Sequence, residues 1–251
     1  MKFQRLDSVD ALRGLAMVWM TAFHFSFDLN YFGYIQQNFH GDPVWTVQRT
    51  VIVSVFLFCA GLGQSIAVAQ GQSWPRFWRR WGQVGACALL VTLGSWWMFP
   101  QTFIYFGVLH GMALMLIVAR FTASWGRWLW WLGGLAIASK FIAAAALNAW
   151  AGGQFSIYFN APMLNWIGWI THLPVTEDYV PVFPWLGVMW WGVAAGSGLM
   201  RARPDWLCRA GAPGFKPLVV LGRWSLSYYM LHQPVMIGLL MALGWLTRFG
   251  A

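Results

Sequence analysis

Charged side chains are scarce in this sequence. Only 9% of the 251 residues are charged, against about 25% in average soluble proteins. Hydrophobic residues make up 59% of the chain, and the mean hydropathy is +0.55. A soluble domain needs more charged surface than this chain has. The composition therefore excludes an ordinary soluble fold and predicts a polytopic membrane protein.

Cysteine is rare as well, which bears on disulfide bonds and metal sites. The three cysteines, Cys59, Cys87 and Cys208, show neither paired nor metal-type spacing, and the first two lie in apolar runs. No two histidines have the four-residue spacing, with a carboxylate, that is typical of a helical zinc site. We therefore expect neither a disulfide framework nor a bound metal, and interpret the cysteines as packing residues.

A membrane-spanning helix needs about 20 mainly apolar residues, and seven segments of this chain provide such a run. They cover residues 11–34, 47–69, 82–99, 103–119, 128–150, 183–200 and 225–246. Two shorter apolar pieces, 163–170 and 217–222, are either interfacial or re-entrant segments or parts of an eighth and a ninth helix. We predict an all-α bundle of seven to nine transmembrane helices that forms one domain over residues 1–251.

The net charge of +9 would suggest nucleic-acid binding in a soluble protein. In a membrane protein the distribution of the basic residues instead indicates which side faces the cytoplasm. We therefore expect no nucleic acid as a partner. With a cytoplasmic N-terminus, 13 of the 16 basic residues fall on the inner side, namely Lys2, Arg5, Arg13, Arg76, Arg79, Arg80, Arg120, Arg127, Arg201, Arg203, Arg209, Lys216 and Arg223. The positive-inside rule therefore predicts this orientation. We expect no removable signal peptide, because acidic residues precede the first apolar run and no cleavage site follows it.

Ionisable residues inside a predicted span are costly, at about 2.5 kcal/mol or more each, and are functional candidates. His24 and Asp28 are four residues apart on the first predicted helix and so share a face. A carboxylate beside an imidazole orients the ring for general-base chemistry. A hydrogen-bonded pair that only locks two helices together explains the same spacing. His110 and His232 are the other intramembrane histidines, and each taken alone fits a structural role.

Basic residues also lie at the predicted cytoplasmic mouth of the first helix. Arg13 follows Ser8 and Asp10, either of which is suited to capping the helix, while the Arg13 side chain extends to the interface. The alternative is that Arg13, with the inner cluster around Arg223, binds the phosphates of a nucleotide-like donor, since guanidinium groups match phosphate oxygens. Both interpretations stay open at this point.

Six segments together carry a family resemblance: residues 8–14 (SVDALRG), 20–33 (MTAFHFSFDLNYFG), 56–61 (FLFCAG), 105–110 (YFGVLH), 181–187 (PVFPWLG) and 221–234 (LGRWSLSYYMLHQP). They resemble the bacterial branch of the heparan-alpha-glucosaminide N-acetyltransferase catalytic domain family, nearly end to end. The opening Asp-x-x-Arg-Gly with an intramembrane His is also similar to the wider group of transmembrane acyltransferases that O-acylate surface polysaccharides.

The resemblance implies that an acetyl group from cytosolic acetyl-CoA is carried to a glucosamine amine across the membrane. It places the family's active-site histidine at His40. The family's polar residue on the first signature helix, Asn in the lysosomal enzyme, falls on His24. Whether His24 or His40 is the main base stays open, and Asp28 is expected to orient His24. Either histidine would deprotonate the acceptor or carry the acyl group.

We therefore predict an acyltransferase of the bacterial inner membrane with a cytoplasmic N-terminus. It would move an acetyl or related acyl group from CoA to a sugar amine or hydroxyl on the periplasmic side. Arg13 and Arg223 would hold the CoA phosphates, and His110 and His232 would line the tunnel. The expected partners are membrane lipid, the CoA donor and a sugar or glycan acceptor, and a homo-oligomer is compatible with the sequence. The rival hypotheses are a small-solute or proton-coupled transporter and an accessory subunit of an envelope complex.

Overall fold

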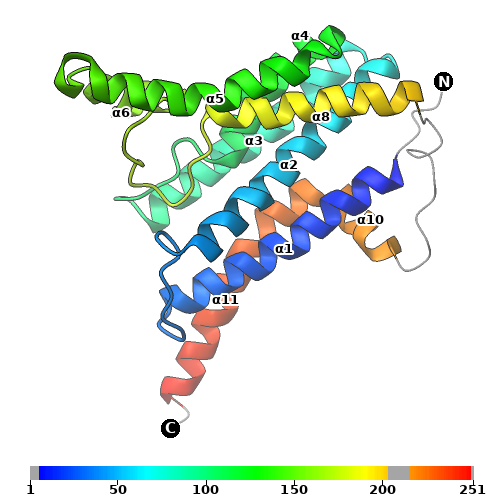
Figure 1. The fold of residues 1–251 in the computed structure, drawn as a ribbon. Coiled ribbons are helices and arrows are strands. Elements are labelled where there is room, and N and C mark those ends of the chain that lie inside the picture. The colour runs from blue at the N-terminus through cyan, green and yellow to red at the C-terminus, as the bar shows by residue number, and fades with distance from the viewer. Residues whose placement is uncertain (1–5, 203–214, 250–251) are drawn as a thin grey trace. The chain divides into compact units, whose positions relative to one another are not determined.

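A computed structural model describes residues 6–202 and 215–249, which form helices and connecting loops with no strand among them (Figure 1). The elements in chain order are α1 (Asp7–Tyr31), α2 (Pro43–Ala69), α3 (Trp74–Met98), α4 (Val108–Thr122), η1 (Ala123–Trp125), α5 (Trp128–Ala149), η2 (Trp150–Gly153), α6 (Ser156–Asn160), α7 (Pro162–Asn165), α8 (Val182–Ala202), α10 (Lys216–Arg223) and α11 (Ser225–Phe249). The basic residues Lys2, Arg5, Arg203 and Arg209, and Cys208, lie outside the described residues.

The predicted all-helical membrane bundle is confirmed. Each of the seven predicted spans coincides with one of the long helices α1 to α5, α8 and α11. Five of these, all except α1 and α3, are long and apolar enough to cross a membrane by length and composition. The short pieces 217–222 and 163–170 fall in α10, in α7 and in the turn after α7. α10 has eight residues and reaches about 12 Å, well short of a bilayer core of about 30 Å.

The chain divides into two compact units, which are described separately. One unit holds residues 57–206, from the second half of α2 through α8, and the other holds residues 5–56 and 207–251. The unit with α1, the first half of α2, α10 and α11 is called the histidine unit below, because His24, His40 and His232 all belong to it. The other is called the α3–α8 unit. Whether the chain acts as one domain over residues 1–251 stays a prediction.

The core of the histidine unit is built from apolar residues of α1, the loop after it and α2. Met17, Met20 and Phe23 of α1 are buried with Phe39 and Phe56. The Phe39 ring stacks on Trp45 at 4.1 Å between ring centroids and contacts Phe23 edge-on at 5.7 Å. This aromatic packing fixes the loop of residues 32–42 against α1, and that loop carries His40.

The α3–α8 unit packs its helices through glycines that allow backbones to touch. A Cβ at Gly187 of α8 would lie 2.4 Å from the carbonyl oxygen of Gly133 in α5. A Cβ at Gly192 would lie 2.2 Å from the carbonyl oxygen of Phe58, and one at Gly196 would lie 3.0 Å from Ser65. Gly192 and Gly196 therefore form a packing face of α8, as small-residue contacts bring membrane helices together.

Candidate functional site

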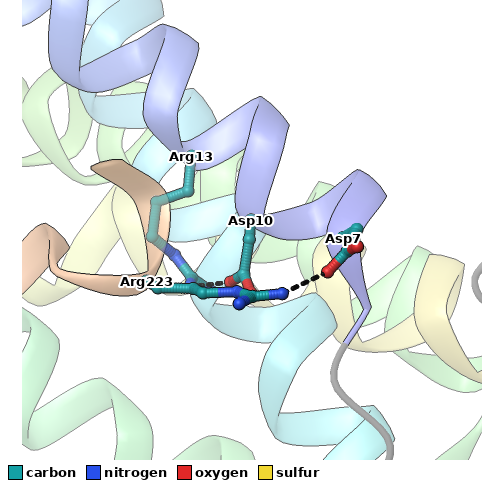
Figure 2. Close-up of polar contacts among 4 residues, drawn as sticks. All are labelled: Asp7, Asp10, Arg13 and Arg223. Atoms are coloured by element: carbon teal, nitrogen blue, oxygen red, sulfur yellow. Dashed lines mark hydrogen bonds and ion pairs between the residues drawn. The ribbon is translucent and has the colours of Figure 1, made fainter. Parts of the chain in front are cut away.

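The N-terminal turns of α1 carry a cluster of alternating charges, drawn in Figure 2. Arg13 Nη1 donates to Asp10 Oδ1 at 3.0 Å, one turn back on the same helix. Arg223, the last residue of α10, donates from Nη2 to Asp7 Oδ1 at 2.7 Å, and its Nε lies 3.7 Å from Asp10 Oδ2. Asp10 thus joins the two arginines that the sequence predicted for CoA phosphates. Both arginines are paired with carboxylates, and Arg223 stays 38% exposed.

Two glycines explain why α10 comes so close to α1 at this point. A Cβ at Gly222 would lie 1.8 Å from the carbonyl oxygen of Asp10, and one at Gly14 would lie 2.0 Å from that of Leu218. Only a residue without Cβ fits at either position. The close approach holds Arg223 against the first turns of α1. The ion-pair cluster is therefore set by backbone packing as well as by charge.

A second polar cluster lies where α11 packs against the later turns of α1. Asp28 is 3% exposed, and its Oδ1 accepts a 2.7 Å hydrogen bond from Gln233 Nε2. His232 is 8% exposed, and its Nδ1 lies 2.7 Å from the carbonyl oxygen of Tyr229. The His24 ring lies 5.3 Å from the His232 ring, between centroids. We call His24, Asp28, His232 and Gln233 the buried polar cluster.

The hydrogen bonds of this cluster fix which atoms remain as acceptors. The Tyr229 carbonyl can only accept, so His232 Nδ1 carries the proton and Nε2 of the neutral ring is a bare acceptor. Gln233 donates to the Asp28 carboxylate, which leaves Gln233 Oε1 as an acceptor. Asp28 Oδ2, His232 Nε2 and Gln233 Oε1 are all buried, and none of them has a hydrogen-bond partner within residues 6–202 and 215–249. Because buried polar atoms are normally satisfied, this group of acceptors is suited to a ligand that donates N–H or O–H groups.

The structure gives the predicted pair His24 and Asp28 different neighbours. They share one face of α1, as their spacing requires. The hydrogen bond to Asp28 comes from Gln233, and the nearest described rings to His24 are His232 and Phe23, with the latter at 5.8 Å between centroids. The pairing of α1 with α11 therefore organises this site. Thr21 supports it one turn earlier through a 2.7 Å hydrogen bond to Tyr228, whose ring stacks on His232.

His40 lies in the loop that follows α1, in a turn, and its side chain is exposed. Its ring lies 6.5 Å from that of Phe27, between centroids. Phe27 is three residues beyond His24 on α1 and also contacts Phe39 edge-on. His40 therefore sits over the end of α1 that carries the buried polar cluster, within the same compact unit.

His110 belongs to the α3–α8 unit, and both of its ring nitrogens are occupied. Gly107 N–H donates to His110 Nδ1 at 3.3 Å, so the proton is on Nε2, which donates to Thr92 Oγ1 at 2.9 Å. The Thr92 hydroxyl in turn donates a hydrogen bond to the carbonyl oxygen of Ile104 at 2.7 Å. His110 thus ties the first turn of α4 to α3. This is the structural alternative left open above, and a role in lining a tunnel stays a prediction.

A comparison with protein families decides the identity of the chain. A family model described as "Heparan-alpha-glucosaminide N-acetyltransferase, catalytic" matches residues 5–234. The chain belongs to this family. The match includes both polar clusters and every predicted site residue, from Arg13 to His232. No curated protein and no solved structure matches the chain significantly.

Membership of the N-acetyltransferase family makes the chain a membrane acetyltransferase in general terms, which the sequence predicted. The described residues contain no group of three or more His, Cys, Asp or Glu side chains that could hold a metal ion. Among the residues of the candidate site, Gln233 was not predicted from the sequence. A glutamine does not ionise, so the cost of burying charge in a span does not single it out. Its place between His232 and Pro234 is the signal that the sequence offers.

Proposed function

We propose that the protein moves an acetyl group from acetyl-CoA at the cytoplasmic face to a sugar amine or hydroxyl that faces the periplasm. The observation that carries this proposal is the buried polar cluster, which lies within the residues matched by the acetyltransferase family. Its three hydrogen-bond acceptor atoms, which have no partner among the described residues, are suited to the N–H or O–H groups of such a sugar. An anionic group would face these three acceptor atoms, one of them on the Asp28 carboxylate, and would be disfavoured there.

The proposed reaction needs one proton acceptor and one thioester. A histidine takes a proton from the acceptor nitrogen or oxygen, the new lone pair attacks the acetyl carbonyl, and the C–S bond of the thioester breaks. The proton then passes to the leaving thiolate, so that free CoA and an acetylated sugar result. His40 and His24 are the proposed bases, and His40 is exposed at the end of α1 where an acceptor from outside would arrive. In a relay, His40 would carry the acetyl group itself.

The two clusters on α1 lie a membrane thickness apart, which supports a transfer across the bilayer. Asp10 and Asp28 are separated by 18 residues of one helix, or about 27 Å, close to a hydrocarbon core of about 30 Å. Arg13 and Arg223 would hold CoA phosphates at the first end, with the phosphate replacing carboxylates as their partner. The polar cluster would hold the acceptor at the other end.

Purified protein incubated with acetyl-labelled CoA and mixed amino sugars tests this proposal. We expect label in the sugar and release of free thiol in equal amounts. A transporter would consume no acetyl-CoA, so sugar uptake into vesicles without thiol release would favour that rival. Absence of both activities, in protein shown to bind CoA, would contradict the proposed acceptor class.

A further inference from the structure

An open groove of about 830 Å³ lies in the α3–α8 unit, and none of its lining residues belongs to either cluster described above. It is formed by the turn between α4 and α5, the first turns of α5 and the end of α8. One part is polar, with Ser124, Arg127 and Arg201, and the other is apolar, with Trp131, Leu132 and Leu135. The positive-inside rule assigns this turn to the cytoplasmic side of the membrane.

The arginines of this groove differ from those at the start of α1. Arg13 and Arg223 are paired with Asp7 and Asp10, whereas neither Arg127 nor Arg201 pairs with an acidic side chain in residues 6–202 and 215–249. Arg201 extends over the turn, where its Nη2 would lie 3.2 Å from a Cβ at Gly126, a residue with φ of +58°. Two guanidinium groups at one groove, without an acidic partner in the described part of the chain, favour an anion such as a phosphate.

The apolar part distinguishes between two sources of that phosphate. Trp131 is 74% exposed and Leu135 is 64% exposed, and only 11% of the apolar window of α5 is buried within the protein. These side chains follow one another along α5 toward the bilayer interior. A free nucleotide gains little binding energy from these exposed apolar side chains. A phospholipid instead offers a phosphate for the arginines, followed by an acyl chain for the apolar side chains.

We propose that the groove binds an anionic phospholipid of the cytoplasmic leaflet. Arg127 and Arg201 hold the phosphodiester, Ser124 donates a hydrogen bond to it, and one acyl chain lies on Trp131 and Leu135. The site is independent of the acetyl-transfer proposal. CoA phosphates share the same chemistry, so the experiment separates the two.

Native mass spectrometry of delipidated protein in detergent, titrated with phosphatidylglycerol and with phosphatidylcholine, provides the test. We expect a preference for phosphatidylglycerol that falls in the double variant Arg127→Gln/Arg201→Gln. Each arginine is worth roughly fivefold in affinity, or about thirtyfold for the pair. Arg49→Gln and Lys216→Gln each remove one exposed positive charge elsewhere and should change the preference by less than about twofold.

A third variant and a competitor complete the design. Trp131→Ser should weaken lipid binding and leave the CoA affinity unchanged, because the thioester donor does not use the apolar side chains of the groove. A melting temperature equal to that of the parent shows that each variant is folded. Equal binding of both lipids, an unchanged preference in the double variant, or displacement of the lipid by CoA overturns the proposal; displacement would assign the groove to CoA.

Discussion

Replacing Gly222 with Ala tests the close contact between α1 and α10 that holds the charge cluster together. The new Cβ would lie 1.8 Å from the carbonyl oxygen of Asp10, so the helices must separate by roughly 1.5 Å to restore ordinary contact. A backbone oxygen cannot rotate away as a side chain can. Overpacking of this kind costs about 1–3 kcal/mol, which exceeds the gain of up to about 1 kcal/mol from alanine's helix propensity.

Gly238→Ala in α11 is the matched control, because no atom lies within 4 Å of a Cβ built there. It should be neutral or stabilising by up to about 1 kcal/mol. Thermal unfolding in detergent, followed by tryptophan fluorescence, measures both variants. A net loss of about 1 kcal/mol, the middle of that cost less the gain in helix propensity, lowers the melting temperature of Gly222→Ala by about 2–4 °C.

The Gly222 substitution has a second consequence that separates packing from charge. Moving α10 outward lengthens the 2.7 Å contact between Arg223 and Asp7, so the CoA affinity should change along with stability if this cluster binds the donor. Gly14→Ala, with its Cβ 2.0 Å from the Leu218 carbonyl oxygen, should behave in the same way. Melting temperatures for Gly222→Ala and Gly14→Ala equal to that of Gly238→Ala would refute the α1–α10 contact.

Three further predictions concern the proposed donor site, the proposed base and the membrane orientation. Arg13→Ala should weaken CoA binding in calorimetry while the fold is retained, and an unchanged affinity would remove Arg13 from the donor site. Asp28→Asn should slow acetyl transfer less than His24→Ala, because Asn still accepts a hydrogen bond from Gln233, whereas loss of a general base costs on the order of 100-fold or more in rate. If both variants transfer acetyl groups as fast as the parent protein, both roles are excluded. In a cysteine-free background, Asp42→Cys should react with an impermeant thiol reagent from outside and Arg79→Cys should not. Labelling of the second position from outside would contradict the predicted orientation.

The sequence predicted the helices well but placed the starts of three of them several residues too late. The second span was predicted from residue 47, whereas α2 begins at Pro43. The first span was predicted from residue 11 and the third from residue 82, whereas α1 begins at Asp7 and α3 at Trp74. An apolar run ends where charge begins, but a helix continues wherever its charges are paired or reach the interface. In α1, Asp7 and Asp10 pair with Arg223 and Arg13.

The candidate site was predictable only in part, because its partners are distant in the chain. The four-residue spacing placed His24 and Asp28 on one face of α1. The group that binds Asp28 is Gln233, 205 residues away, and spacing within one helix carries no information on which element packs against it. The ion pair of Arg223 with Asp7 spans 216 residues, so the sequence showed both arginines without showing that carboxylates hold them.

Transfer of label from acetyl-CoA to an amino sugar by the parent protein and by His40→Ala is the most direct test of the proposed chemistry. We expect the parent to acetylate the acceptor and release one thiol per acetyl group. His40→Ala should lose transfer and keep its CoA affinity, and His24→Ala should lose on the order of 100-fold or more in rate. If both histidine variants acetylate as fast as the parent protein, the mechanism proposed for this site is wrong.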